Sequence, residues 1–431
     1  MPAVRSPESH PHLTPSALTS SASLRGRHVV FLSWRDTRNP EGGGAELYLE
    51  RMAEGLVARG CSVTIFSAAH AAAPGEELRD GIRYVRRGTK TTVYLEGVRA
   101  LRRGELGVPD LVVDVQNGLP FFSRLATDAP VVVLVHHVHR EQWPVVYPGL
   151  VGKVGWWIER RLAPWFYRRN QYVAVSAATR AELAGHGVSS DRVAVVHNGT
   201  DPVRPLSPGP APTPVLATVG RLVPHKQVEH AIDVAVALRE THPDLRLHVV
   251  GGGWWDDELR AHAARMGAGD TVVFEGHVSE ARKHEIYEQA WLHLMPSLKE
   301  GWGLVIGEAG MHDTPTVAYA AAGGVCESID DGRSGVLVDD ADEMLEVARR
   351  LLADPAELAR LAEGARAMSH TYSWPSAQES FAHVVSSAIA GVRVGGQDPA
   401  PPVVGRTSVL RRTARRWTRE RADRADWSRA G

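Results

Sequence analysis

Two glutamates stand eight residues apart across a glycine-rich stretch, EGWGLVIGE, at 300–308. An apolar run and a Pro-Ser break precede the stretch, which predicts that Glu300 lies in a loop leaving a strand and that Glu308 lies about two turns into the next helix. The start of such a helix offers backbone N–H groups and a positive dipole end to an anion. We expect Glu300 to accept sugar hydroxyls, Gly303 and Leu304 to turn their amides toward phosphate oxygens, and Glu308 to accept a ribose hydroxyl pair. Two solvated glutamates on an ordinary helix are the alternative that this spacing alone leaves open.

Two cations follow another strand-like run upstream. The run VLATV, at 215–219, ends beside Arg221, and Lys226 comes five residues after that arginine. Charge-assisted bonds from Arg and Lys are the contacts that a diphosphate requires, because Arg can grip two oxygens while Lys acts as a point charge. We therefore expect Arg221 and Lys226 to bind the diphosphate of a ligand.

The order of several short motifs resembles a known family. The chain is similar to the retaining, nucleotide-sugar-dependent glycosyltransferases of family 4, also called the group 1 transferases, which have the GT-B fold. The resemblance runs from about residue 29 to residue 374 and is carried by EGGGAE (41–46), LVHH (134–137), VVHNGTD (195–201), GRLVPHK (220–226), VVGGG (249–253), FEGHVSE (274–280) and the pair of glutamates. Each motif alone is weak, and the ordered set is specific.

The resemblance implies further contacts with the donor. Gly43 and Gly44 are expected to approach its phosphates and sugar, because a residue without a Cβ lets the backbone come close. His136 is expected to contact the donor sugar and to help place the acceptor, and the backbone near Gly276 to Val278 is expected to meet the base. Trp302 stands where the family often has Phe, and Cys326 where it usually has Pro, so the shape of the sugar pocket is left open.

The resemblance also implies transfer with retention of anomeric configuration. Glu300 is interpreted as a ligand of sugar hydroxyls and not as a nucleophile, and the departing phosphate oxygen takes the acceptor's proton. No metal or other cofactor is expected, because Arg221, Lys226 and a helix N-terminus balance the diphosphate charge. The one D-x-D string, Asp340-Ala341-Asp342, is interpreted as a helix cap. Neither a G-x-G-x-x-G nor a G-x-x-x-x-G-K-[ST] string occurs in the chain.

Composition is that of an ordinary globular protein. The 431 residues are 43% apolar with a formal net charge of −1, which argues against a nucleic-acid-binding protein. Two cysteines are too few for a disulfide framework. No long apolar run marks a membrane span or a secretory signal, so we expect a cytoplasmic location, with peripheral contact at the inner face of the membrane left open.

Short β-branched runs alternate with helical stretches, which predicts an α/β fold of two Rossmann-like domains with the ligand in a cleft between them. The predicted boundaries are a disordered leader at 1–26, an acceptor-side domain at 27–203, a proline-rich linker at 204–214, a nucleotide-sugar-binding domain at 215–375, a helix at 376–395 that packs back toward the first domain, and an arginine-rich, largely disordered tail at 396–431.

Two segments raise the question of membrane contact. In the stretch 154–170, one helical face flanked by arginines is shared by Trp157, Ile158, Leu162, Trp165 and Phe166. The favoured interpretation is a helix that packs this apolar face on the first sheet and turns its arginines outward. The second segment is the tail, where residues 406–429 carry nine arginines, and a solvated tail is favoured over an anchor.

The sequence thus predicts an enzyme that moves a hexosyl group from a nucleoside-diphosphate sugar to a hydroxyl acceptor. A GT-B epimerase or hydrolase acting on a nucleotide sugar, and a non-catalytic nucleotide-sugar-binding protein, are the alternatives. The sugar, the base, the acceptor (a sugar, a lipid-linked sugar or a small molecule) and the oligomeric state are not specified by the sequence.

Overall fold

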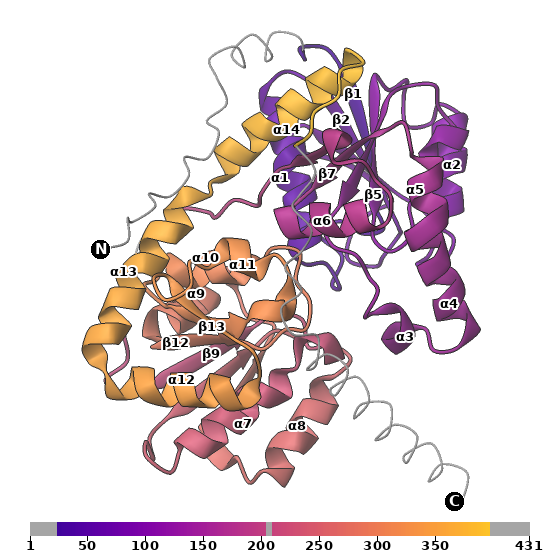
Figure 1. Ribbon diagram of the computed structural model, residues 1–431. Helices are drawn as coiled ribbons and strands as arrows, with labels where there is room; N and C mark the ends of the chain where they lie inside the picture. Colours follow the sequence, from indigo (N-terminus) through magenta and orange to yellow (C-terminus); the bar gives the residue numbers. More distant parts are fainter. Residues whose placement is uncertain (1–23, 204–208, 397–431) are drawn as a thin grey trace, which may run out of the picture. The chain divides into compact units, whose positions relative to one another are not determined.

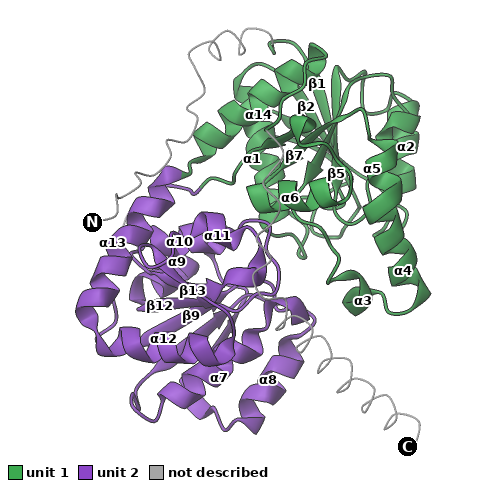
Figure 2. Cartoon of the chain, in the orientation of Figure 1, with its two compact units in different colours: residues 1–199, 372–397 green, residues 200–371, 398–431 purple. Residues whose placement is uncertain are grey.

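The structure is a computed structural model that describes residues 24–203 and 209–396. It divides into two units (Figure 2): unit 1 contains the described residues up to Gly199 and those from Tyr372 on, and unit 2 contains Thr200–Thr371. The described end of the predicted leader belongs to unit 1, because Leu24 is fully buried and the Gly26 amide donates to a carbonyl at 2.9 Å. Residues 1–23 of the leader, 204–208 of the linker and 397–431 of the tail lie outside the described residues.

Unit 1 is built on an eight-stranded sheet with the order β3-β4-β2-β1-β5-β6-β7-β8. All neighbouring strands are parallel except β3 and β4. The strands are β1 His28–Leu32, β2 Ser62–Ser67, β3 Glu76–Arg79, β4 Ile82–Arg86, β5 Leu111–Gln116, β6 Val131–Val135, β7 Gln171–Ala174 and β8 Val193–Val195. The central strands are buried along their whole length, as expected of a parallel sheet covered on both faces.

Helices cover both faces of this sheet, with α1 and α14 on one face and α2 and α5 on the other (Figure 1). The helices of unit 1 are α1 Gly44–Ala58, α2 Val93–Arg102, α3 Trp143–Val146, α4 Leu150–Trp157, α5 Ala163–Phe166, α6 Ala177–Gly185 and α14 Trp374–Ile389, with a π-helical turn Ile158–Leu162 between α4 and α5. Helix α14 packs along α1, where the Gln378 side chain donates to the Arg51 carbonyl at 2.8 Å. Trp374 begins α14, so the chain passes into unit 1 a few residues before the predicted boundary at 375.

Unit 2 contains a six-stranded, fully parallel sheet with the order β11-β10-β9-β12-β13-β14. Its strands are β9 Val215–Val219, β10 Arg246–Val250, β11 Val272–Gly276, β12 Leu292–Met295, β13 Thr316–Tyr319 and β14 Gly335–Val338. Its helices are α7 Val228–Leu238, α8 Asp256–Arg265, α9 Glu280–Gln289, α10 Leu304–Gly310, α11 Val325–Ser328, α12 Ala341–Ala353 and α13 Pro355–Thr371. The prediction of two α/β domains with mostly parallel sheets is confirmed.

No helix of the described residues is both long and apolar enough to cross a membrane.

A buried ion pair fixes the loop that follows β1. Asp36 and Arg86 are both nearly inaccessible, and the guanidinium donates to the carboxylate. Burial opposes ionisation of Asp36, but the Arg86 side chain outweighs it and lowers the pKa of the carboxyl below its ordinary value. The same guanidinium also donates to the Glu77 carboxylate at 2.7 Å and to the Pro74 carbonyl at 2.9 Å, so one side chain joins three segments.

We predict that Arg86→Met lowers the free energy of unfolding by about 3 kcal/mol, because it leaves a buried carboxylate without its cation. Urea denaturation measures the change. The control is Arg83→Met on the same strand, whose 40% exposed side chain pairs with Glu76 at 3.2 Å and should contribute less than about 1 kcal/mol. Equal losses in the two variants would contradict the role given to the buried pair.

Candidate functional site

In unit 2, glycines bring two loops together at the carboxyl ends of β9 and β10. The Leu222 amide donates to the Gly252 carbonyl at 2.9 Å, and a Cβ on Gly251 would lie 2.0 Å from the Gly220 carbonyl oxygen. Only glycine therefore fits at 251. This packing leaves Arg221 at the end of β9 exposed, with no ion pair to another described residue.

The loop after β9 is also joined to the loop after its neighbour β12. The Leu298 amide donates to the His225 carbonyl at 2.9 Å, and directly beyond these residues the Lys226 ammonium pairs with the Glu300 carboxylate. Both side chains of the pair are mostly buried. The structure thus brings together the cation and the carboxylate that the sequence singled out separately.

Glu300 is ionised in this setting. Burial opposes its ionisation, but the Lys226 ammonium and a hydrogen bond from Ser297 outweigh burial and lower the pKa of the carboxyl below its ordinary value. A low-pKa carboxylate accepts hydrogen bonds and does not donate a proton near neutral pH. This protonation state is the one that the predicted role of Glu300, as an acceptor of hydrogen bonds from hydroxyls, requires.

Close backbone contact holds the Glu300 loop in place. The Glu300 amide donates to the Ala322 carbonyl at 2.7 Å, and its carbonyl accepts from the Gly324 amide at 3.2 Å. A Cβ on Gly324 would lie only 1.9 Å from the Gly301 carbonyl oxygen. The segment around 322–324 therefore acts as a fixed support for the loop.

The start of α10 has the geometry expected from the sequence. Gly303 is its N-cap with a φ of 91°, a value that favours glycine, and Leu304 is its first residue. Glu308 is the fifth residue of α10, so it lies little more than one turn in, and the prediction of two turns was wrong. Its carboxylate is 3.1 Å from the Lys283 ammonium and accepts from the Tyr287 hydroxyl at 3.4 Å.

Val278 lies half-buried in the loop between β11 and α9, packed against a small cluster of buried residues. The backbone just before it is tied to the neighbouring strand end, because the Gly276 carbonyl accepts from the Gly251 amide at 2.8 Å. Asp340 caps α12, since its side chain accepts from the Glu343 amide at 3.0 Å, and the capping interpretation is confirmed for this residue.

In unit 1, Gly43 and Gly44 form the start of α1. Gly43 is the N-cap, and its amide donates to the Glu46 carboxylate at 2.8 Å. Gly44 is the first residue of the helix. The Gly43 amide is therefore already bound by a carboxylate of the protein, at a residue whose backbone was predicted to approach the donor.

His136 lies against the same helix. Its ring meets the Tyr48 ring edge-on, with centroids 5.3 Å apart, and its Nε2 has no hydrogen-bond partner among the described residues. Burial, with a smaller contribution from His139, lowers the pKa of His136 to about 4, so the ring is neutral at neutral pH. His139 itself is held by Asn117 at 2.7 Å and by Glu159 at 3.1 Å, which makes it a structural residue.

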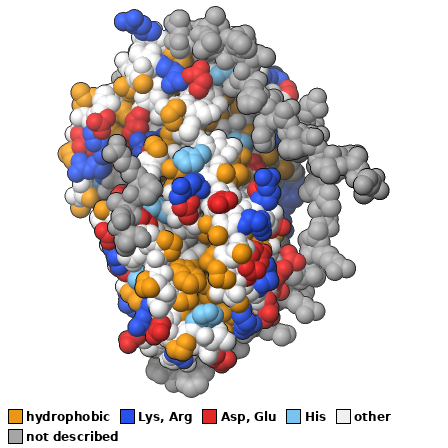
Figure 3. Space-filling model, turned by 90° about the vertical axis from the view of Figure 1, so that its left-hand side faces the viewer, with side chains coloured by type: hydrophobic (Ala, Val, Ile, Leu, Met, Phe, Trp, Pro, Cys, Tyr) orange, Lys and Arg blue, Asp and Glu red, His pale blue; other side chains and the backbone are white. Residues whose placement is uncertain are grey.

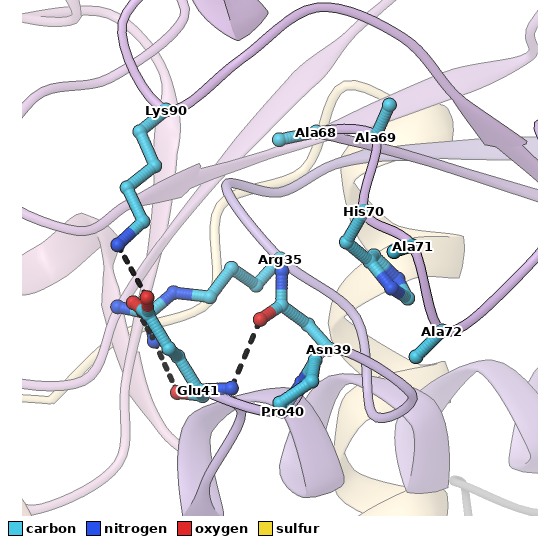
Figure 4. Close-up of a pocket in the computed structure, with 10 residues that line it drawn as sticks. All are labelled: Arg35, Asn39, Pro40, Glu41, Ala68, Ala69, His70, Ala71, Ala72 and Lys90. Atoms are coloured by element: carbon cyan, nitrogen blue, oxygen red, sulfur yellow. Dashed lines mark hydrogen bonds and ion pairs between the residues drawn. The ribbon is translucent and has the colours of Figure 1, made fainter. Parts of the chain in front are cut away.

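The sequence did not single out a hollow of about 450 Å³ in unit 1, beside the glycine loop (Figure 4). Lys90 and Arg35 both reach the Glu41 carboxylate across it, and His70 with a run of alanines forms another wall. A cation shortly after the end of a strand was the signal that marked Arg221, and Arg35 and Lys90 follow β1 and β4 in the same way. The same rule would have found them.

The predicted residues thus form two groups, each within its own unit. Lys226 with Glu300, and Gly303 with Leu304 and Glu308, belong to unit 2, whereas His136, Gly43 and Gly44 belong to unit 1. The ligand contacts assigned to them remain predictions.

Two family models match consecutive parts of the chain. Residues 42–204 match the model described as glycosyltransferase family 4, and residues 206–368 match glycosyl transferases group 1.

The individual relatives are also glycosyltransferases. The D-inositol 3-phosphate glycosyltransferase of Xylanimonas cellulosilytica is 30% identical over 425 residues, which cover 84% of this chain and 97% of the relative. The protein of that name from Acidothermus cellulolyticus is 33% identical over 242 residues, 51% of this chain and about half (53%) of that relative.

Solved structures show the same fold. Sucrose-phosphate synthase from Thermosynechococcus elongatus has a TM-score of 0.70 at 20% identity, covering 82% of this chain and 96% of that one. Anabaena HepE in complex with UDP-glucose has a TM-score of 0.67 at 21% identity, covering 84% and 99%.

We predict that Gly324→Ala lowers the rate of the reaction at this site by about 100-fold, because the added Cβ displaces the Glu300 loop by an ångström or so. Gly185→Ala, where a Cβ meets nothing within 4 Å, is the matched control and should leave the rate unchanged. Steady-state turnover of both variants measures the effect. An unchanged rate in Gly324→Ala would show that the support is not needed.

Proposed function

The chain belongs to the family 4, or group 1, glycosyltransferases, which have the GT-B fold, and we propose that it moves a hexosyl group from a nucleoside-diphosphate sugar to a hydroxyl acceptor with retention of configuration and without a metal ion. The observation that carries the proposal is the Lys226–Glu300 pair, together with the exposed Arg221 in the segment that joins β9 to Lys226.

The two cations are suited to the diphosphate. Arg221 is exposed and is not held by a carboxylate of the described chain, so its guanidinium can bind phosphate oxygens without first breaking an ion pair. Lys226 is held by Glu300, and a bound diphosphate would share its ammonium. Arg221 and Lys226 together supply the positive charge that other transferases take from a divalent ion. This supports a metal-independent reaction.

The carboxylates are suited to the sugar. In the proposed reaction Glu300 accepts hydroxyls of the donor hexose, and Glu308 exchanges its contact with Lys283 for the ribose hydroxyls. The bond between the anomeric carbon and the diphosphate breaks, the acceptor oxygen bonds to that carbon on the same face, and the departing phosphate oxygen takes the acceptor's proton. His136, which is neutral, donates or accepts a hydrogen bond at the donor sugar.

The donor class is supported by structural neighbours that were solved with UDP and with UDP-glucose. For the acceptor, the hollow beside the glycine loop offers two cationic side chains, Arg35 and Lys90, which both reach the Glu41 carboxylate and could bind an anionic group. We propose a phosphorylated polyol as the acceptor there, in keeping with the name of one relative, D-inositol 3-phosphate glycosyltransferase.

The activity test uses the purified full-length chain with a panel of nucleotide sugars and hydroxyl acceptors, with and without EDTA. We expect one donor to give a glycoside only when acceptor is present, with the donor's anomeric configuration by NMR, and equally well in EDTA. An epimerase or hydrolase would consume donor without acceptor, and a binding protein would bind donor without turnover. An inverted product, or one lost in EDTA, would contradict the proposed mechanism.

We predict that Glu300→Gln lowers kcat by about 10²- to 10³-fold while the donor still binds, because the amide keeps the shape but loses the charge. The control is Glu346→Gln, which changes an exposed carboxylate on α12 whose ion pair within residues 24–203 and 209–396 is with Arg349. Isothermal titration with the donor and steady-state rates separate the two effects. Full turnover in Glu300→Gln would remove the role given to this carboxylate.

A further inference from the structure

One segment of unit 1 carries a concentration of exposed apolar side chains. Seven of the fourteen large apolar residues exposed in the described chain fall between Val146 and Trp165. Five of them lie on the helical stretch from α4 to α5: Leu150, Val151, Val154, Trp157 and Trp165, of which Leu150 is 75% exposed, Trp157 56% and Trp165 61%. Helices α3 and α4 project from the body of unit 1 (Figure 1).

The exposure results from how α4 packs. Its inner face is made of Gly152 and Gly155, and a Cβ on Gly155 would lie 2.2 Å from the ring of Trp143. Glu159 continues this inner face, where its carboxylate accepts from the Trp143 indole at 2.6 Å. Because the small and polar residues face inward, the large apolar residues face outward. The prediction that the apolar face packs on the sheet was therefore wrong for Trp157 and Trp165.

Unbalanced positive charge surrounds these apolar residues. Residues 140–170 contain six cations and two carboxylates, Glu141 and Glu159, and the second of these is buried. Lys153, Arg160 and Arg161 are exposed and form no ion pair with another residue of the described ranges. On the face shown in Figure 3, by contrast, cationic and anionic side chains lie side by side. The excess charge is thus a local feature of a chain whose net charge is −1.

We propose that this surface, the docking face, binds the surface of an anionic lipid bilayer. The docking face consists of the exposed apolar side chains of residues 146–165 and the exposed cations from Lys153 to Arg169. Apolar side chains of an interfacial helix enter the boundary between headgroups and acyl chains, and cations beside them attract anionic headgroups. Tryptophan is favoured at this depth, because its ring is apolar and its N–H can reach water.

Charge selects this occupant over a second copy of the chain. Two copies meeting through the docking face would bring cations of the same sign together around an apolar contact, which is unfavourable at low ionic strength. A bilayer with anionic headgroups satisfies both the apolar side chains and the cations. The docking face adds to the proposed function but does not depend on it, since lipid binding is measured without any sugar donor.

The experiment is flotation of the full-length protein with vesicles of phosphatidylcholine, alone or with one third phosphatidylglycerol. We expect binding to the mixed vesicles and little to phosphatidylcholine alone. Raising NaCl from about 0.1 M to about 1 M, which shortens the screening length from about 10 Å to about 3 Å, should weaken it.

Two variants divide the docking face into its parts. Leu150→Ser/Trp157→Ser/Trp165→Ser should lower partitioning by at least about tenfold, since burying even one such side chain is worth that much. Lys153→Gln/Arg160→Gln/Arg161→Gln should lower it by about fivefold for each cation removed. The matched control, Leu78→Ser/Leu95→Ser/Val108→Ser, removes equally exposed apolar side chains elsewhere on unit 1 and should float like wild type.

Thermal melting shows whether each variant is folded, and bromolipid quenching of tryptophan fluorescence, lost in the apolar variant, would place the indoles in the bilayer. Flotation of the apolar variant at the wild-type level, or equal binding to neutral vesicles, would overturn the proposal. A dimer in sedimentation that the apolar variant abolishes, without vesicle binding, would assign the face to a second copy and would also overturn it.

Discussion

The ion pair between Lys226 and Glu300 is the interaction on which the candidate site of unit 2 depends. It joins the loops that leave two neighbouring strands, β9 and β12, and keeps Glu300 ionised although the carboxyl is buried. Without the cation, burial would raise the pKa of the carboxyl and favour its neutral form. The pair therefore sets both the position and the charge of the group that is proposed to hold the sugar, and it places a cation where a diphosphate can share it.

Glycines make this arrangement possible by letting backbones touch. Gly251 lies against Gly220, and Gly324 against Gly301, at distances that leave no room for a Cβ. In unit 1 a glycine also makes a close contact, but there it exposes side chains. Gly155 packs against Trp143, so the large side chains of α4 point outward. In both units, the absence of a side chain at one residue decides where the functional side chains of its neighbours point.

Much of the fold followed from the sequence, because fully buried parallel strands appear as continuous β-branched runs, and β9 begins and ends at the residues of the run predicted at 215–219. The β3–β4 hairpin was missed, although Asp80-Gly81, with both residues at positive φ, is a strong two-residue turn signal. The pairing of Lys226 with Glu300 could not be predicted from the sequence, because it depends on β9 and β12 being neighbours in the sheet. The outward face of α4 was mispredicted because helical periodicity identifies an apolar face but not whether small residues opposite it will take the buried position.

The most direct test of the account is thermal stabilisation of the purified protein by nucleoside diphosphates and their sugar conjugates, with and without chelator, in wild type and in Arg221→Ala/Lys226→Ala. The account predicts that one nucleotide raises the melting temperature, that chelator does not change the shift, and that the double variant loses it. At a concentration about 100-fold above Kd, the ligand should add about 2.7 kcal/mol to stability. No shift with any nucleotide, or an undiminished shift in the double variant, would contradict the assignment of these cations to the diphosphate.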